Sequence, residues 1–164
     1  MKPTKNNAKE LSVFPSDRTP VHMTELVLPS HTNAHGTIFG GVVMGWIDIA
    51  GAIACQKYAR SGVVTVSIDS LHFIVPIKIG FTVHIYAEVT YAGKTSMETE
   101  VTVKAENGMT GESRVATHAF LTYVAVDEFG RPKAVPPYKP RNEREKQNFS
   151  AALQRKDARL KARS

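Results

Sequence analysis

The feature that most constrains the fold is a long apolar segment, residues 42–59, which contains no proline. Its length suits a helix of about five turns. Apolar side chains would cover every side of this helix, at Val42, Val43, Met44, Trp46, Ile47, Ile49, Ala50, Ala52, Ile53 and Ala54. A helix that is apolar all round is expected to be buried all round, so the rest of the chain has to enclose it.

Five other segments have the β-branched, partly alternating composition of strands, namely 21–28, 63–75, 81–91, 95–105 and 112–126. The last two separators are Ala92-Gly93-Lys94 and Glu106-Asn107-Gly108, and the latter contains Asn-Gly, a strong hairpin signal. The four later strands are therefore predicted to form an antiparallel meander. One long apolar helix combined with one sheet predicts an α+β fold in which the sheet curls around the helix.

The length of 164 residues suits one domain with a substantial core. Residues 1–19 are polar and Lys-rich, which predicts a loose N-terminal arm. Residues 20–138 would form the domain, and residues 139–164 a basic C-terminal extension of helical composition. A narrow apolar stripe marks this extension, at Phe149, Leu153 and Leu160. A solvated or loosely docked helix is the favoured interpretation, ahead of binding to a partner or a membrane surface.

The net charge of +6 arises from the C-terminal extension, which contains nine Lys or Arg and three Asp or Glu. The remainder of the chain is neutral, which argues against a nucleic-acid-binding function. No apolar run is long enough to span a bilayer, and no secretory signal is visible. A single cysteine, Cys55, allows no intramolecular disulfide and fits a reducing compartment. We therefore expect a cytoplasmic protein with no membrane span.

The six histidines lack a spacing suited to a metal site, so no metal ion is expected. Cys55 lies on the apolar helix and is expected to be a buried structural thiol rather than a nucleophile.

Asp48 is the exception within the apolar helix. A carboxylate in such surroundings is costly unless it is hydrogen-bonded, paired or used in chemistry. Two interpretations stay open at this point. Asp48 can be a structural residue satisfied by backbone groups or by an arginine across an interface, or it can be a functional group.

The loop before the helix, residues 33–41, ends in Gly40-Gly41. Two glycines at a helix start leave the first amides open to a ligand oxygen, at the positive end of the helix dipole. A carbonyl placed there would be stabilised as its oxygen becomes negative. Asp48 follows about two turns later, roughly 11 Å along the helix. A close-packed helix start is the alternative explanation of the two glycines.

The loop sequence Asn33-Ala34-His35-Gly36-Thr37-Ile38-Phe39-Gly40-Gly41, followed by Trp46-Ile47-Asp48, resembles the signature of hotdog-fold acyl-CoA thioesterases. The similarity is greatest to the YciA-like and cytosolic long-chain acyl-CoA hydrolase group, and it extends over about residues 21–137. The resemblance implies the hotdog fold and hydrolysis of acyl-CoA to a fatty acid and free CoA. It implies no cofactor, because CoA is part of the substrate.

The resemblance also implies roles for particular residues. Asp48 would be the general base or nucleophile, Asn33 would position the water or the thioester, and the amides of Gly40 and Gly41 would bind the oxyanion. In related enzymes a hydroxyl from the partner's central strand assists. Ser67 is the matching candidate, with Thr65 and Asp69 on the same strand face. The contacts to CoA are expected in one turn, at Gly93, Lys94, Thr95 and Ser96.

The family places its active sites between two subunits, which implies a homodimer at minimum and a trimer of dimers as a common larger assembly. Two other functions remain as alternatives. One is a non-catalytic acyl-CoA sensor, against which Asp48 and Asn33 argue. The other is a hotdog dehydratase or hydratase, which is disfavoured because His72-Phe73 follows the helix, whereas the dehydratase histidine precedes it. The acyl chain length and the choice between CoA and acyl carrier protein stay open.

Overall fold

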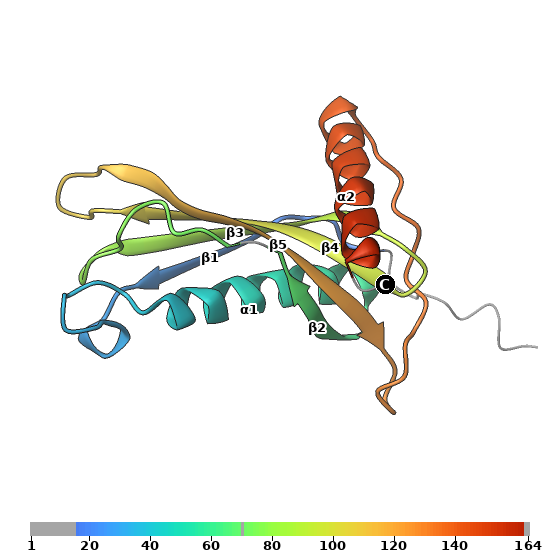
Figure 1. Ribbon diagram of the computed structural model, residues 1–164, viewed down its shortest axis with the longest axis horizontal. Coiled ribbons are helices and arrows are strands. Elements are labelled where there is room, and N and C mark those ends of the chain that lie inside the picture. The colour runs from blue at the N-terminus through green and yellow to red at the C-terminus, as the bar shows by residue number, and fades with distance from the viewer. Residues whose placement is uncertain (1–15, 70, 163–164) are drawn as a thin grey trace, which may run out of the picture.

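The computed structural model describes residues 16–69 and 71–162. Five strands, one short 3₁₀ helix and two long helices follow one another along this part of the chain (Figure 1). Their bounds are β1 Val21–Leu26, η1 Pro29–His31, α1 Gly40–Ala59, β2 Gly62–Ile68, β3 Thr82–Ala92, β4 Ser96–Glu106, β5 Ser113–Val126 and α2 Glu143–Lys161. The predicted α+β class is confirmed: one antiparallel sheet curls against α1, and α2 is added at the C-terminal side.

The strand order in the sheet is β1-β3-β4-β5-β2, and every pairing is antiparallel. The predicted meander is correct for β3, β4 and β5 but wrong for β2, which pairs with β5 instead of β3. The reason is the connection over residues 69–81, which is too long for a tight hairpin. It leads from β2, at one edge of the sheet, to β3, next to the strand at the opposite edge. The strand predicted over residues 63–75 accordingly ends at Ile68.

The core lies between one side of α1 and the inner face of the sheet. From α1 it contains Val43, Ile47, Ala50, Ala54, Cys55 and Tyr58, and these pack with sheet residues such as Val83, Ile85, Val101, Val103 and Leu121. Each large aliphatic side chain buried in this way stabilises the fold by about 1.5–3 kcal/mol. The Cys55 side chain is fully buried, and its burial raises the pKa of the thiol. A protonated, inaccessible thiol is structural, as predicted.

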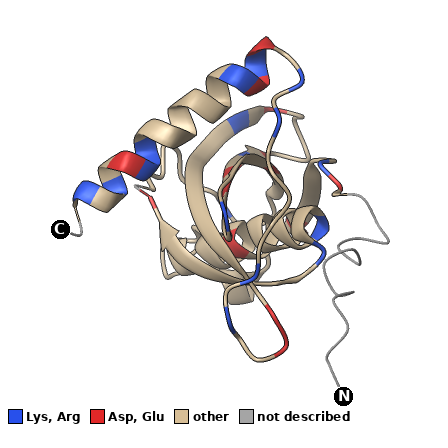
Figure 2. Ribbon diagram, turned by 90° about the vertical axis from the view of Figure 1, so that its right-hand side faces the viewer, with Lys and Arg blue, Asp and Glu red and all other residues tan. Residues whose placement is uncertain are grey.

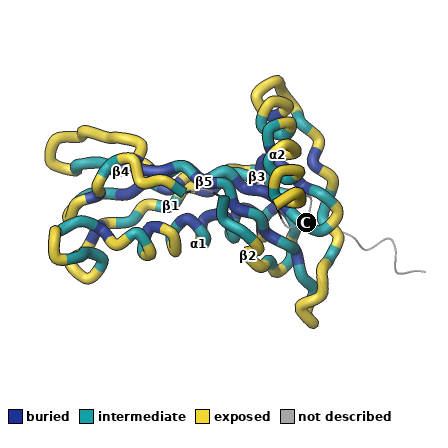
Figure 3. The backbone as a smooth tube through the Cα atoms, in the orientation of Figure 1, coloured by how far each residue is buried: buried dark blue, intermediate teal, exposed yellow. Residues whose placement is uncertain are grey.

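The expectation that α1 is buried on every side is wrong for a single chain. Met44 is 41% exposed and Ile49 is 50% exposed, and Gly41 and Gly45 lie on the same uncovered side. Figure 3 shows buried and exposed positions alternating along this helix. The physical reason is that the sheet of one chain covers only one side of α1. The opposite side is an apolar surface that no segment of residues 16–69 and 71–162 covers.

Helix α2 is docked on the outer face of the sheet, and Figure 2 shows its Lys and Arg positions gathered toward its two ends, with an uncharged stretch between them. The Glu98 carboxylate on β4 is only 1% exposed, and it pairs with Arg155 at 2.7 Å and with Arg159 at 3.1 Å. Nearer the start of α2, Phe149 packs on the rings of Tyr91 and Tyr138. The basic charge of the extension is thus taken up in part by carboxylates of the sheet, and a buried carboxylate needs such partners.

Of the predicted N-terminal arm, residues 1–15 lie outside the described part of the chain. Within the described ranges, neither α1 nor α2 is apolar enough over sufficient length to cross a membrane.

Candidate active site

The Asp48 carboxylate lies on α1 and accepts hydrogen bonds from two hydroxyl groups of the sheet. Thr65 Oγ1 on β2 donates to Asp48 Oδ1 at 2.7 Å, and the Tyr123 hydroxyl on β5 lies 3.1 Å from the same oxygen. The Tyr123 hydroxyl also lies 2.8 Å from the Asp48 backbone carbonyl. Over residues 16–69 and 71–162 no cation pairs with Asp48, and Oδ2 has no hydrogen-bond partner. An arginine from across an interface, the structural alternative for Asp48, would have to come from a second chain.

Tyr123 can act only as a donor to this carboxylate. Burial raises the pKa of the Tyr123 hydroxyl, and the nearby negative charge of Asp48 raises it further. The hydroxyl therefore stays protonated at physiological pH. Thr65 donates to Oδ1, and the single Tyr123 proton is shared between Oδ1 and the closer Asp48 carbonyl oxygen. The two hydroxyls together orient the carboxylate and leave Oδ2 available for chemistry.

Gly51 allows the Tyr123 ring to approach α1, and sequence reasoning missed both residues. A Cβ atom at Gly51 would collide with the Tyr123 hydroxyl and lie 3.0 Å from Thr99 Oγ1. A glycine inside a helix costs about 1 kcal/mol relative to alanine, so its presence in mid-helix was the available signal of a packing requirement. Tyr123 gave no comparable signal, because an inward tyrosine on a strand is common.

Replacing Gly51 by Ala should lower the free energy of unfolding by about 1–3 kcal/mol, because the added methyl group overpacks the Tyr123 contact. Chemical denaturation measures this effect. The matched control is the same substitution in a Tyr123→Phe background, where the penalty should shrink because the colliding hydroxyl is gone. An equal penalty in both backgrounds would show that the Tyr123 hydroxyl is not what requires glycine here.

The Asn33 side chain is engaged in its own loop. Its Nδ2 donates to Thr37 Oγ1 at 3.0 Å, and its Oδ1 accepts the backbone amides of His35 at 2.9 Å and Thr37 at 3.3 Å. Among the described residues there is no hydrogen bond between Asn33 and Asp48. One chain thus does not bring these two predicted site residues together.

Helix α1 begins at Gly40, and no side chain caps the backbone amides at its N-terminus. Its N-cap, Phe39, has no side-chain capping bond, and its carbonyl accepts the amides of Val42 and Val43. In the described part of the chain the amides of Gly40 and Gly41 have no hydrogen-bond partner. A Cβ atom at Gly40 would lie 3.1 Å from the ring of Phe73. Close packing and open amides therefore occur together here, so the two interpretations of Gly40-Gly41 are compatible.

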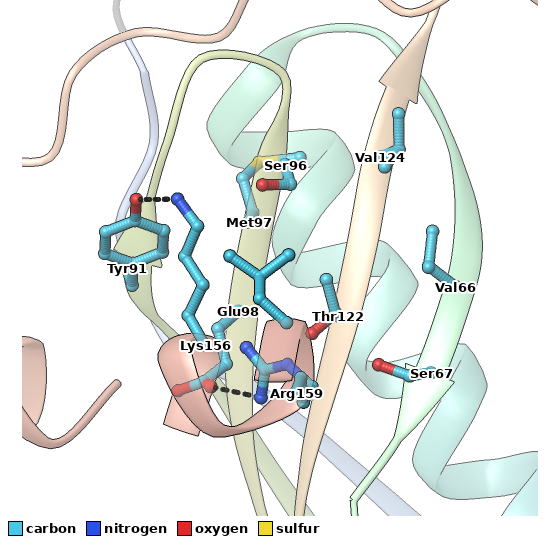
Figure 4. A pocket seen from close by; sticks show the side chains of 11 residues that line it. Val66, Ser67, Tyr91, Ser96, Met97, Glu98, Thr122, Val124, Lys156 and Arg159 are labelled. Atoms are coloured by element: carbon cyan, nitrogen blue, oxygen red, sulfur yellow. Dashed lines mark hydrogen bonds and ion pairs between the residues drawn. The ribbon is translucent and has the colours of Figure 1, made fainter. Parts of the chain in front are cut away.

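Ser67 does not face Asp48. A register irregularity between Thr65 and Ser67 puts Thr65 opposite Tyr123 and Ser67 opposite Thr122. An irregularity of this kind breaks the simple alternation of faces along a strand. Ser67 therefore lines a cavity under α2 on the outer face of the sheet (Figure 4). The hydroxyl that one chain brings to its own Asp48 is that of Thr65.

The turn predicted to contact CoA joins β3 to β4, at the end of the sheet away from the start of α1 (Figure 1). The Gly93 amide donates to the Ser96 carbonyl at 2.8 Å, and the carbonyls of Lys94 and Thr95 accept amides from residues 135 and 125. The Lys94 side chain is exposed. The backbone of this turn is therefore held rigidly, and a charged side chain projects from it into solvent.

Comparison with known proteins relates this arrangement to acyl-CoA hydrolases. The family model of the thioesterase superfamily matches residues 35–112. The uncharacterized acyl-CoA thioester hydrolase YkhA of Bacillus subtilis is 40% identical over 136 residues, which cover 83% of this chain and 79% of that protein. The acyl-CoA thioester hydrolase YciA of Escherichia coli is 40% identical over 114 residues, which cover 68% of this chain and 86% of that protein.

Two solved structures are similar over most of their length. An apo-hexameric acyl-CoA thioesterase superposes with a TM-score of 0.85 at 44% identity, covering 92% of this chain and 97% of the other. An acyl-CoA hydrolase of Staphylococcus aureus, in complex with butyryl coenzyme A, coenzyme A and coenzyme A disulfide, has a TM-score of 0.80 at 38% identity and covers 88% of each chain. That hydrolase has also been solved with one aspartate, one threonine or one asparagine replaced by alanine.

Proposed function

Because the chain belongs to the thioesterase superfamily and is an acyl-CoA thioesterase of the hotdog fold, we propose that Asp48 is its catalytic carboxylate. The observation that carries the proposal is the environment of Asp48: two hydroxyls hold Oδ1, while Oδ2 has no partner in the described part of the chain. As a general base, Oδ2 takes a proton from the water that attacks the thioester carbonyl. In the nucleophilic variant, Oδ2 attacks the carbonyl carbon itself, the C–S bond breaks, CoA leaves as the thiol, and water then hydrolyses the acyl-aspartate anhydride to the acid and the free carboxylate. A positioned general base contributes about 10²–10⁴-fold to the rate.

The spacing of site residues supports the same assignment. In the Staphylococcus aureus hydrolase, the asparagine and aspartate replaced by alanine are 15 residues apart, and the aspartate and threonine are 17 apart. Asn33, Asp48 and Thr65 have the same two intervals. We therefore assign Asn33 to positioning of the water or thioester, and Thr65 to the hydroxyl role for which Ser67 was the sequence candidate.

The oxyanion site in this proposal is the Gly40 amide, with Gly41 as a second donor. Both amides are open at the start of α1. Within one chain they lie roughly 11 Å of helix rise from Asp48, too far for one carbonyl group to contact both. Two α1 helices packed antiparallel through their uncovered apolar sides would bring Gly40 of one protomer beside Asp48 of the other. The proposal therefore includes a homodimer with active sites shared between protomers, as a unit from which a hexamer can be built.

The contacts to the CoA moiety are assigned to the β3–β4 turn, residues 93–96. Its backbone is held by three hydrogen bonds, and Lys94 is free to approach a phosphate. The Lys94 contribution is expected to be small, because exposed ion pairs are worth about 1 kcal/mol or less.

Release of free thiol from butyryl-CoA, followed with a chromogenic thiol reagent, tests the proposed machinery. Thr65→Val should lower kcat/KM about 10–100-fold, because a hydrogen bond to a charged group contributes about 1.5–3 kcal/mol. The matched control is Ser67→Ala on the same strand, which should leave hydrolysis within about twofold of wild type, a negligible free-energy change. Loss of activity in Ser67→Ala and not in Thr65→Val would return the hydroxyl role to Ser67.

A further inference from the structure

The cavity that Ser67 lines is on the outer face of the sheet, under α2. It has a volume of about 170 Å³. Figure 4 shows its walls: Ser67 from β2, Thr122 and Val124 from β5, Ser96 from β4, and Lys156 and Arg159 from α2. The proposed catalytic residues Asp48 and Asn33 do not line it. The pocket is therefore separate from the proposed catalytic carboxylate, and Ser96 is its one wall residue that also belongs to the turn assigned to CoA.

Lys156 supplies a positive charge that no carboxylate neutralises. Its ammonium group donates to the Tyr91 hydroxyl at 2.9 Å, and within the described ranges it forms no ion pair. The other two charged wall residues, Glu98 and Arg159, pair with each other. Beside the wall, Arg155 also pairs with Glu98, and Asp69 also pairs with Arg159. The pocket wall thus has an excess of one positive charge.

A hydroxyl group of the pocket also lacks a partner. Thr122 Oγ1 is shielded from solvent and forms no hydrogen bond in the described part of the chain. A buried polar atom left without a partner costs about 1–3 kcal/mol. Ser67 and Ser96 place further hydroxyls on the same walls. Thr122 Oγ1 itself is covered, so an acceptor atom bound here would find the Lys156 cation and the hydroxyls of Ser67 and Ser96.

The remaining walls are apolar, formed by Val66, Val124, Leu160 and the side of Tyr91. An apolar cavity of about 150 Å³ can hold benzene, so this one has room for a ligand of about six heavy atoms. We propose that the pocket under α2 binds a small carboxylate with a short apolar tail. The acid released by thioester hydrolysis belongs to this chemical class.

The pocket is on the opposite face of the strands that hold Asp48. On β5, Tyr123 points inward to Asp48 and its neighbour Thr122 faces the pocket. On β2, Thr65 donates to Asp48 and Ser67 faces the pocket. A carboxylate seated in the pocket is therefore separated from the catalytic aspartate by one layer of strand.

Methyl NMR of the full chain, labelled at valine and leucine and titrated with butyrate, tests the proposal without relying on catalysis. Resonances of Val124 and Leu160 should shift and saturate, while Leu153, on α2 but outside the pocket wall, stays unchanged. Lys156→Gln should weaken this binding at least about tenfold, because it removes the charge that pairs with the carboxylate. The matched control Lys146→Gln removes an exposed lysine from the same helix and should leave binding unchanged.

Two further probes separate the contributions of the charge and the tail. Butyramide, which has the tail without the charge, and inorganic phosphate, which has charge without a tail, should each shift the pocket resonances less than butyrate. The proposal is overturned if Val124 and Leu160 do not respond to butyrate, or if they respond equally in a folded Lys156→Gln variant. It is also overturned if phosphate binds as well as butyrate. Butyrate shifts confined to α1 would mark product binding near Asp48 and would likewise contradict the pocket site.

Discussion

Asp48→Asn should lower kcat for butyryl-CoA hydrolysis about 10³-fold, within the 10²–10⁴-fold that a general base contributes. Asparagine has nearly the same size as aspartate, and its carbonyl oxygen can still accept from Thr65 and Tyr123. The fold and the substrate KM should therefore change little, while the proton acceptor on Oδ2 is lost. Steady-state thiol release at saturating butyryl-CoA measures the effect.

The matched control is Asp157→Asn, which removes an exposed carboxylate from α2 and should leave kcat unchanged. An Asp48→Asn protein that is folded and retains kcat within about tenfold of wild type would remove Asp48 from the catalytic role. That result would also favour the alternative in which the carboxylate only fastens α1 to the sheet. If wild type binds acyl-CoA but releases no thiol, the sensor alternative gains support.

Two inactive variants should restore activity when they are paired in one dimer. Asn33→Ala and Asp48→Asn, co-expressed with different tags and purified as a mixture, should reach about a quarter of wild-type activity, because half the dimers are mixed and each mixed dimer has one intact site. The reason is geometric. If each site takes Asn33 from one protomer and Asp48 from the other, a mixed dimer assembles one site with both native residues.

The control for this experiment is a mixture of two differently tagged Asp48→Asn chains, which should stay as inactive as Asp48→Asn alone. A mixed Asn33→Ala and Asp48→Asn dimer, isolated through both tags and still inactive, would show that the two residues act within one chain. That outcome would overturn the shared-site geometry while leaving the role of Asp48 itself intact.

The uncovered side of α1 shows where sequence reasoning reached its limit on burial. The apolar composition of residues 42–59 predicts a helix enclosed on every side, yet Met44 and Ile49 are half exposed in one chain. An apolar composition predicts that a surface is buried away from water. It does not indicate whether the same chain or a second copy covers that surface. The shared-site proposal assigns that cover to a partner protomer.

The choice between Thr65 and Ser67 depended on a detail that alternation cannot supply. Both residues are expected on one face of a regular strand, and one register irregularity in β2 sends their hydroxyls to different faces of the sheet. Tyr123 and Gly51 were missed for a related reason. Their contact joins residues 72 positions apart in the chain, and neither residue has a local pattern that requires the other.

By itself the sequence determined the features that depend on near neighbours in the chain. Helix α1, the approximate strands, the hairpin turns and the open glycine start of the helix follow from hydrophobic period and turn chemistry. The tertiary structure alone decided that β2 pairs with β5, that Thr65 and Tyr123 converge on Asp48, and that the basic C-terminal helix docks on carboxylates of the sheet. These contacts depend on how segments far apart in the chain are placed relative to one another. The local pattern of each segment is compatible with several placements, and packing of the whole domain selects one of them.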